Sequence, residues 1–439
     1  MAKALYVGVN GTAKKAKKLY VGYGNIARKV KKIYVGDASG KARLAWSGGG
    51  ASQRMLFYKR SQTIMDSSEE IPNTFNEISN PFGTNEPWLL YDKYNERFVA
   101  LNKSAWTSSS STDASRAVYI MPANGNTWTQ VGSLPSGKYW NFNNTTRKPV
   151  VTESGILLPI KYDDSETTTM SAALMTIDNN AITLVYSKNL SVKSYTRLYS
   201  QFAKVDNYYT IVTSESQSNN PCYLYVSYVS DFQNGAWTKK QVAYNYYGFY
   251  CGLWLDRNAI CKYNSKYYLF ADGFSSGQTE SRTLHIISGT DFSNMTQVQT
   301  INYAGSTTSS QKNLSEPVMM YKDGKAYINN PYITGYTVFP TKGMYSVNLS
   351  TYAVTKEASS YAGPTDGSWA QMRQAGYFAF DYNGTYWYIF GPTDTSSRLT
   401  KSVFLYYSTD FLTWTAIDYR NQLGTLSNSG EIGFALVSE

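Results

Sequence analysis

The chain has 439 residues, 16% of them charged and 15% aromatic, a composition that excludes a disordered chain and suits several domains or one large all-β unit. Its single histidine and its three cysteines, Cys222, Cys251 and Cys261, exclude a His/Cys metal cluster and a disulfide framework, so we expect no metal, no cofactor and reduced, packed thiols. The net charge of +10 resides in residues 1–50, which hold 11 of the 41 bases and one of the 31 acids, so the rest of the chain is neutral.

No apolar run approaches the roughly 18 residues needed to span a bilayer. Met1-Ala2-Lys3-Ala4 leads into a Gly- and Lys-rich segment and not into the apolar core of a signal peptide. We therefore expect synthesis in the cytoplasm and no membrane insertion. The uneven charge predicts two modules, a basic N-terminal segment and a large neutral one.

A 14-residue repeat fills residues 1–46. Each copy carries a Tyr-Val-Gly triplet, at Tyr6-Val7-Gly8, Tyr20-Val21-Gly22 and Tyr34-Val35-Gly36, and the third copy has one extra residue before its alanine. Asn10-Gly11 between strand-forming residues is a strong hairpin signal, because both positions tolerate positive φ. Each copy therefore predicts one small hairpin, which is too small for a core and becomes stable by stacking or by docking on a partner.

Three interpretations of this basic run stay open. It can be a solvated arm that keeps the protein in solution. Basic residues interleaved with tyrosine also suit nucleic acid, which is the less favoured partner because a strict repeat is more than a non-specific arm requires. The third interpretation comes from a likeness. Tandem Tyr-Val-Gly-x-Asn-Gly-x-Ala-(Lys/Arg)-Lys units resemble those near the start of virion structural proteins in phages of Gram-positive bacteria.

That resemblance covers residues 1–46 and implies a tail, baseplate or fibre component, present in several copies in the virion, whose repeats bind other virion proteins. The attachment residues that it implies are the repeated positions Tyr6, Gly8, Tyr20, Gly22, Tyr34, Gly36 and Trp46. Residues 47–52, with three consecutive glycines, then read as a flexible linker.

Residues 53–439 show short strand-like runs and turns with little helical periodicity, so we expect an all-β domain. In six similar units an apolar strand leads through a polar turn into a second, often aromatic strand. The second strands are marked by Phe98, Leu157, Tyr208, Tyr267, Tyr327 and Tyr386, at intervals of 51 to 60 residues. A period near 60 with about four strands per unit predicts a six-bladed β-propeller.

Several units also carry a turn motif. Ser408-Thr409-Asp410 with Trp414, Ser230-Asp231-Phe232 with Trp237, and Thr290-Asp291-Phe292 resemble degenerate Asp-boxes of sialidase-like and related glycan-handling propellers. Asn124 to Trp128 looks like the equivalent turn without the Ser-x-Asp. The aspartate caps its turn and the tryptophan packs between blades, so the motif predicts a fold and not an activity.

Both ends of the domain carry strand-like runs, Arg54-Met55-Leu56-Phe57-Tyr58 and residues 430–437. A ring of blades must close, and pairing of these two ends within one blade would remove the exposed strand edges. We therefore expect the ring to close in this way.

Propeller active sites lie at the axis, where the first strand of each blade begins. Glu86 and Glu316 occupy matching positions there, and Asp256 precedes another inner strand, so these three are the candidate acid and base of a glycosidase. The alternative is a polar, water-filled funnel. No Arg-x-Pro-type segment opens a blade, as a sialidase-like site would require, and His285 reads as a strand-packing or surface histidine.

The excess of aromatic residues predicts a binding surface, because Tyr and Trp stack on sugars and proteins at low entropic cost. The most Tyr-rich segment, residues 244–250, is expected to be an exposed loop. The candidate ligand-binding residues are Tyr246, Tyr247, Tyr250, Trp254, Arg257 and Arg373. The sequence thus indicates a virion protein that binds host-surface glycan or a neighbouring virion protein, with a cell-envelope glycan hydrolase or a purely structural fitting as alternatives.

Overall fold

The structure is a computed structural model, and it describes the backbone of about three fifths of the chain. The described residues are 6–9, 12–15, 19–23, 26–30, 32–36, 42–47, 54–58, 63–69, 72–85, 87–102, 116–136, 139–140, 149–161, 169–191, 201–216, 222–245, 248–251, 260–274, 282–304, 320–330, 343–358, 378–382, 385–390, 404–410, 412–419 and 434–436.

The three N-terminal repeats each form one antiparallel hairpin, as predicted. The strand pairs are β1 (Tyr6–Val9) with β2 (Thr12–Lys15), β3 (Leu19–Tyr23) with β4 (Ile26–Val30), and β5 (Lys32–Gly36) with β6 (Ala42–Ser47). Two residues connect the strands in the first two hairpins and five in the third. The additional residue of the third copy therefore lies in its turn, and Gly36 still pairs with Ala42 as Gly8 pairs with Ala13.

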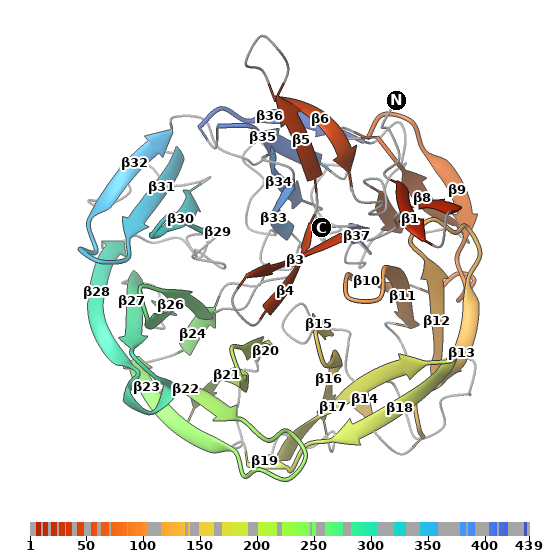
Figure 1. Ribbon diagram of the computed structural model, residues 1–439. Helices are drawn as coiled ribbons and strands as arrows, with labels where there is room; N and C mark the ends of the chain where they lie inside the picture. The colour runs from red at the N-terminus through yellow and green to blue at the C-terminus, as the bar shows by residue number, and fades with distance from the viewer. Residues whose placement is uncertain are drawn as a thin grey trace.

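The rest of the described chain forms a β-propeller, with seven antiparallel sheets of four or more strands around a ring (Figure 1). We number these sheets as blades 1 to 7 in chain order and give their strands from the inner edge outward. Blade 1 comprises β37 (Phe434–Leu436), β7 (Met55–Tyr58), β8 (Thr63–Ser67) and β9 (Asn76–Ser79). Blade 2 comprises β10 (Pro87–Asp92), β11 (Arg97–Asn102), β12 (Ala117–Pro122) and β13 (Thr129–Ser133).

Blade 3 comprises β14 (Tyr139–Trp140), β15 (Val150–Thr152), β16 (Gly155–Lys161), β17 (Thr169–Asp178), β18 (Ala181–Tyr186) and β19 (Leu190–Ser191). Blade 4 comprises β20 (Gln201–Val205), β21 (Tyr208–Ser216), β22 (Cys222–Val229) and β23 (Thr238–Asn245). Blade 5 comprises β24 (Gly248–Cys251), β25 (Ile260–Tyr263), β26 (Lys266–Phe274), β27 (Arg282–Gly289), the short 3-10 helix η2 (Phe292–Asn294) and β28 (Thr296–Ala304). Blade 6 comprises β29 (Met320–Lys322), β30 (Lys325–Asn330), β31 (Gly343–Asn348) and β32 (Val354–Ala358). Blade 7 comprises β33 (Phe378–Tyr382), β34 (Thr385–Phe390), β35 (Phe404–Ser408) and β36 (Thr415–Asp418).

The all-β propeller is thus as predicted, but the predicted number of six blades is wrong, because seven sheets lie within the described residues. The six sequence markers all fall in second strands, those of blades 2 to 7. Blade 1 was missed because its inner strand, β37, comes from the far end of the chain. It therefore lacks the local inner-strand hairpin from which the other units could be recognised.

The two ends of the domain meet in blade 1, which confirms the predicted closure. β37 pairs antiparallel with β7, placing Ala435 opposite Leu56. Tyr419, which follows the last strand of blade 7, is fully buried against Phe57 and Phe75, with ring centres 6.0 and 5.4 Å away. Its hydroxyl donates a hydrogen bond of 2.7 Å to the carbonyl of Pro72. Blade 7 is thereby attached to blade 1.

The hydrophobic core lies between the blades, because successive residues of each strand point to opposite faces of its sheet. In β11, Phe98 and Ala100 belong to a cluster shared with blade 1, whereas Val99 and Leu101 belong to a cluster shared with blade 3. Similar clusters join blade 3 to blade 4 and blade 4 to blade 5. Blades 2, 3 and 4 therefore bury both faces, which explains strands that are apolar throughout.

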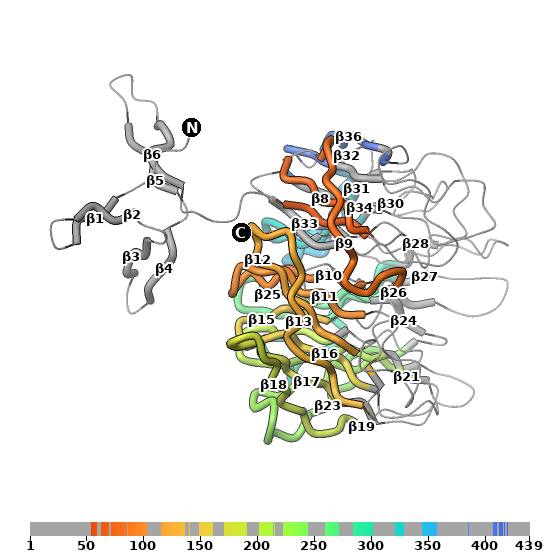
Figure 2. Tube along the Cα trace, turned by 90° about the vertical axis from the view of Figure 1, so that its right-hand side faces the viewer, coloured from red at the N-terminus to blue at the C-terminus, as the bar shows by residue number. Residues whose placement is uncertain are grey.

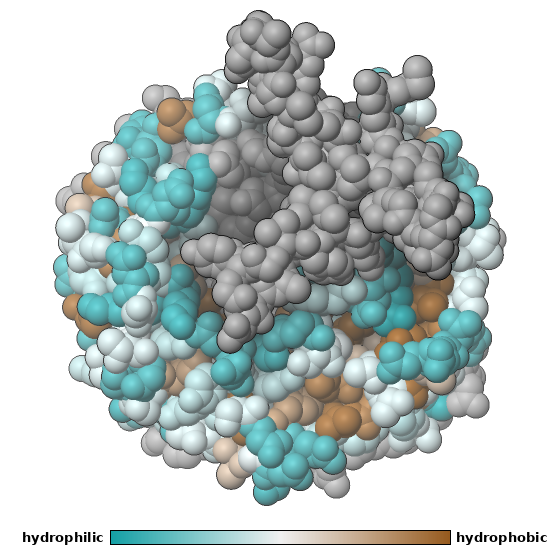
Figure 3. Space-filling model, in the orientation of Figure 1, coloured by the Kyte–Doolittle hydropathy of each residue, from teal (hydrophilic) through white to brown (hydrophobic). Residues whose placement is uncertain are grey.

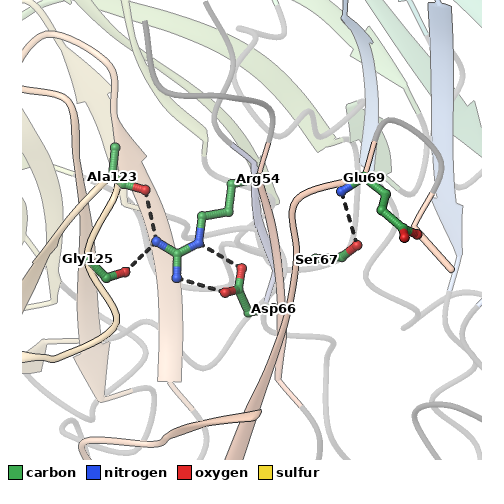
Figure 4. A network of polar contacts seen from close by, with 6 residues as sticks. All are labelled: Arg54, Asp66, Ser67, Glu69, Ala123 and Gly125. Carbon is green, nitrogen blue, oxygen red and sulfur yellow. Dashed lines mark hydrogen bonds and ion pairs between the residues drawn. The ribbon is translucent and has the colours of Figure 1, made fainter. Parts of the chain in front are cut away.

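A buried arginine links the first two blades. The guanidinium of Arg54 forms a bidentate ion pair with Asp66, with N···O distances of 2.7 and 2.9 Å. It also donates to the carbonyls of Ala123 and Gly125 in the turn between β12 and β13 (Figure 4). The Asp66 carboxylate therefore neutralises the charge of Arg54, and the hydrogen bonds from the guanidinium hold the turn of the neighbouring blade in place.

The connections divide the ring into two sides, and Figure 2 shows the ring edge-on. The turn side carries the connections from first to second and from third to fourth strands, such as 206–207 and 230–237. The loop side carries the connections from second to third strands and from one blade to the next, most of which lie outside the described residues. The inner strands begin on the loop side.

Asp or Asn side chains cap the turn between third and fourth strands in four blades. Asp410 accepts hydrogen bonds from the amides of Leu412 and Thr413, both at 2.8 Å. The same pair of bonds, to amides two and three residues on, is made by Asp231, Asp291 and Asn348. The predicted Asp-box turns are thus confirmed at Asp231, Asp291 and Asp410.

The residue after the capping side chain packs between blades. Phe232, Phe292 and Leu349 are all buried, and the Phe292 ring stacks on Tyr267 at 4.5 Å. Trp237 lies against Phe202, with ring centres 6.3 Å apart, in the cluster between blades 3 and 4. The tryptophan of this turn therefore packs between blades as predicted.

We expect Tyr419→Ala to lower the free energy of unfolding by about 3 kcal/mol, because it empties an aromatic site in the closing contact. Tyr419→Phe removes only the hydrogen bond to Pro72 and is expected to lose about 1 kcal/mol. Urea titration followed by tryptophan fluorescence measures both. Equal effects of the two variants would contradict a packing role for the ring.

The caps predict a pH effect. Hydrogen bonds from the amides of Thr413 and Leu412 lower the pKa of Asp410 from 3.8 to about 2. A carboxylate with a lowered folded-state pKa stabilises the protein above its unfolded-state pKa, and this stabilisation disappears as the pH falls through the folded-state pKa. We therefore expect Asp410→Ala to lower the thermal midpoint at pH 7 and to differ less from the wild type as the pH falls from about 4 towards 2.

Asp410→Asn is the matched control, because asparagine already caps the equivalent turn at Asn348. It should keep most of the stability at pH 7 without the acid dependence of the aspartate. A thermal midpoint as low as that of Asp410→Ala would show that the cap does not act through these backbone bonds.

Candidate functional site

Most of the predicted axial and ligand-binding residues lie outside the described residues. These are Glu86, Glu316, Asp256, Arg257, Arg373, Tyr246, Tyr247 and Trp254. Five of these residues are charged, and the strand that follows each of them in the sequence is an inner strand as expected. These strands are β10 after Glu86, β25 after Asp256 and Arg257, β29 after Glu316 and β33 after Arg373. The assignment of these side chains to a site stays a prediction.

The Tyr-rich segment 244–250 is largely strand and not the predicted loop. Tyr244 and Asn245 end β23, and Gly248 to Tyr250 belong to β24, where Tyr250 pairs with Asp272. Tyrosine and phenylalanine favour pleated sheet, so their enrichment lengthened the strands. Only residues 246 and 247 of the segment lie outside the described strands.

The inner strand is divided in blades 3 and 5. β24 and β25 both pair with β26, and β14 and β15 both pair with β16. In the sequence, residues 141–149 and 252–259 connect the two parts of the inner strand in their blades. Sequence periodicity did not reveal this division.

The described residue that matches the predicted binding surface best is Tyr244, at the loop-side end of blade 4, which is 66% exposed. The register places Tyr244 opposite Tyr223, and Tyr223 opposite Glu215. Directly paired residues share a face of the sheet. Three adjacent strands thus bring two tyrosines and a carboxylate together in one row.

The row continues into a charged pair. Glu215 is only 1% exposed, and its carboxylate accepts a hydrogen bond of 2.5 Å from Lys239 Nζ. The same Nζ lies 4.3 Å from the centre of the Tyr225 ring. We call Glu215, Tyr223, Tyr225, Lys239 and Tyr244 the blade 4 cluster. Its ammonium is held between the Glu215 carboxylate and the face of the Tyr225 ring.

Tyr225 of this cluster keeps its phenolic proton at neutral pH. Burial, and secondly the negative charge of Glu215, raise the pKa of Tyr225 above its ordinary value. The ring of Tyr223 lies 6.3 Å from that of Tyr225, inclined at 48°. The cluster therefore offers two adjacent aromatic faces, a third exposed ring, and hydroxyl and ammonium donors.

Other charged contacts are better explained as links between blades. On the turn side, Lys204 of blade 4 pairs with Glu153 of blade 3, and Lys262 of blade 5 pairs with Asp206 of blade 4 at 2.5 Å. Both lysines belong to inner strands, and both acids to the turn of the preceding blade. Their repetition indicates a structural role.

The structure describes the side chains of the histidine and of one cysteine, Cys261. His285 is buried in β27, with Nδ1 2.6 Å from Gln297 Oε1, and burial lowers its pKa, so it is a packing histidine as expected. Cys261 is a half-buried free thiol. In the part of the chain that the structure describes, no three His, Cys, Asp or Glu side chains could hold a metal ion, and no helix could cross a membrane.

Sequence reasoning missed Glu215 and Lys239. The available signal was an acid in the otherwise uncharged strand Tyr208–Ser216, because an isolated charge in a buried strand requires a partner. On the face shown in Figure 3, hydrophilic residues cover most of the described surface, with smaller hydrophobic areas between them.

Comparison with known proteins gives only distant likenesses. No protein-family model matches the chain, and no curated protein matches it. A solved structure of a protein from Lactobacillus plantarum is 12% identical, covering 87% of this chain and 99% of that one, with a TM-score of 0.43. Polysaccharide lyase Uly1 is 8% identical, covering 79% and 87%, with a TM-score of 0.46. Trypanosoma rangeli sialidase is 11% identical, with a TM-score of 0.33, and the match covers 86% of this chain and 52% of the sialidase. The propeller assignment rests on the sheets themselves.

Lys239→Met should destabilise the protein by about 2 kcal/mol, because it leaves the buried Glu215 carboxylate without its ammonium partner. The double variant Glu215→Gln/Lys239→Met should recover part of this loss, since no buried charge then remains. Urea titration of the wild type, the two single variants Glu215→Gln and Lys239→Met, and the double variant gives the coupling energy. Additive effects would show that the ion pair contributes no specific interaction.

Proposed function

We propose that this protein is a structural component of a phage particle, in its tail, baseplate or fibre, and that its propeller binds glycan on the host surface. The virion part rests on the likeness of the 14-residue repeats to those of phage structural proteins. The glycan part rests on the blade 4 cluster.

The observation that carries the glycan proposal is the exposed tyrosine row beside a fixed ammonium. Tyr244 is the most exposed of the large hydrophobic side chains in the described chain. Aromatic rings that stack on a ligand need to be accessible and rigid, and tyrosine has few rotatable bonds. Lys239, already fixed by Glu215 and Tyr225, is a preorganised donor for hydroxyl or acidic groups of a sugar.

The position of the cluster also supports a binding role. Glu215, Tyr223 and Tyr244 lie at the loop-side end of blade 4, whose last strand leads into the inner strand of blade 5, and Lys239 comes from the other end of β23. The predicted residues Tyr246, Tyr247 and Trp254 belong to the connections that follow it directly in the chain. They are proposed to extend the same surface, as are Arg257 and Arg373 around the axis.

We expect Tyr244→Ala to weaken binding to wall polysaccharide of a Gram-positive host about tenfold, which corresponds to ~1.4 kcal/mol for one lost stacking contact. Biolayer interferometry with immobilised polysaccharide and the full-length protein measures this. The matched control is Tyr94→Ala, which removes another exposed tyrosine, 47% accessible, from a turn on the opposite side of the ring.

The control variant should bind as the wild type does. Equal losses in both variants, or no binding by the wild type, would contradict the proposed surface. Release of reducing sugar from the polysaccharide, abolished by Glu86→Gln or Glu316→Gln, would instead identify a glycan hydrolase.

A further inference from the structure

The three N-terminal hairpins repeat one pairing of residues. In each, a Tyr-Val-Gly triplet runs antiparallel to a triplet that begins with alanine and continues with a base. The paired triplets are Tyr6-Val7-Gly8 with Ala13-Lys14-Lys15, Tyr20-Val21-Gly22 with Ala27-Arg28-Lys29, and Tyr34-Val35-Gly36 with Ala42-Arg43-Leu44. The register is the same in all three, although the turns differ in length.

This register places the bases at fixed positions. Lys14, Arg28 and Arg43 each lie opposite the valine of their triplet, and Lys15 and Lys29 lie opposite the tyrosine. In the first two hairpins both of these register positions carry a base, and in the third the second position is Leu44.

The charge of these hairpins is not balanced by the rest of the protein. Residues 1–50 carry the whole net charge of +10, and the other 389 residues hold 30 bases and 30 acids. Lysine suits the edges of a two-stranded hairpin, but the excess of 11 bases over one acid in residues 1–50 is complementary to an acidic surface. The arrangement indicates an acidic partner outside the chain.

We infer that the three hairpins are equivalent docking units, which bind an acidic protein site presented in several copies by a symmetric virion component. This inference rests on the proposed role in the particle and adds the chemistry and multiplicity of the partner. Binding to a nucleic acid would need only a run of basic residues, whereas here the lysines and arginines keep one register next to Tyr, Val and Gly. Linked units bind a repeated site far more tightly than any one of them.

The test compares charge reversals within the paired triplets of the hairpins with the same charge reversal outside them. One variant carries Lys14→Glu/Lys15→Glu, a second carries Arg28→Glu/Lys29→Glu, and a third combines them. The matched control, Lys17→Glu/Lys18→Glu, makes the same change of charge between the first two hairpins. Copies of the full-length chain per purified phage particle are counted by quantitative mass spectrometry.

Each single-hairpin variant should lower the copy number about tenfold, and the combined variant should lower it to background, because the loss of one linked unit weakens the whole attachment. The control should keep more than about half of the wild-type copies, since its bases lie outside the paired triplets. An equal loss in the control, retention of the combined variant, or capture of the wild type by double-stranded DNA as strongly as by particles would overturn the inference.

Failure of the inference can be told apart from failure of the proposed function. If particles contain the chain whatever its hairpin charge, the virion role stands and the docking units do not. If no particle contains the wild-type chain, both fail. An unchanged thermal midpoint of the propeller in every variant excludes general unfolding as the cause of a lost signal.

Discussion

The structure depends on the contact that joins blade 7 to blade 1. Blades 2, 3 and 4 bury apolar residues on both faces, so such blades need a neighbour on either side, and a row of blades becomes stable only when its two ends meet. Here the last strand, β37, completes the first blade beside β7, and Tyr419 fills the space against Phe57 and Phe75. Residues more than 340 positions apart in the chain thus share one core, as the hydrogen bond from Tyr419 to Pro72 shows.

A closed ring allows its two sides to differ. On the turn side, short connections are fixed by side-chain caps such as Asp410 and by ion pairs between an inner strand and the turn of the preceding blade, such as that of Lys262 with Asp206. The loop side receives the longer connections, and there the blade 4 cluster places Lys239 between Glu215 and Tyr225. Rigid scaffolds typically carry their binding residues on such connections. The buried ion pair fixes the ammonium, while Tyr244 remains accessible.

Much of the fold could be predicted from sequence because its signals are local. Strand, turn and second strand recur in one unit, so the markers from Phe98 to Tyr386 all fall in second strands. Blade 1 could not be counted in this way, since its first two strands, β37 and β7, come from opposite ends of the domain and are joined by no turn. The candidate site was harder to predict from the sequence than the fold. Tyrosine enrichment pointed to residues 244–250, but the pairing of Glu215 with Lys239 depends on which residues become neighbours across β21, β22 and β23.

We propose a division of labour, in which charged hairpins hold the protein to the particle and the neutral propeller binds the cell. The most direct test is saturation binding of fluorescently labelled full-length protein to Gram-positive cells, comparing a triple variant, Tyr223→Ala/Tyr225→Ala/Tyr244→Ala, with one in which Lys14, Lys15, Arg28 and Lys29 are all replaced by Glu. The account predicts saturable, strain-selective binding that the tyrosine variant loses and the hairpin variant retains. Binding that follows the hairpin charge and ignores the tyrosines would contradict it.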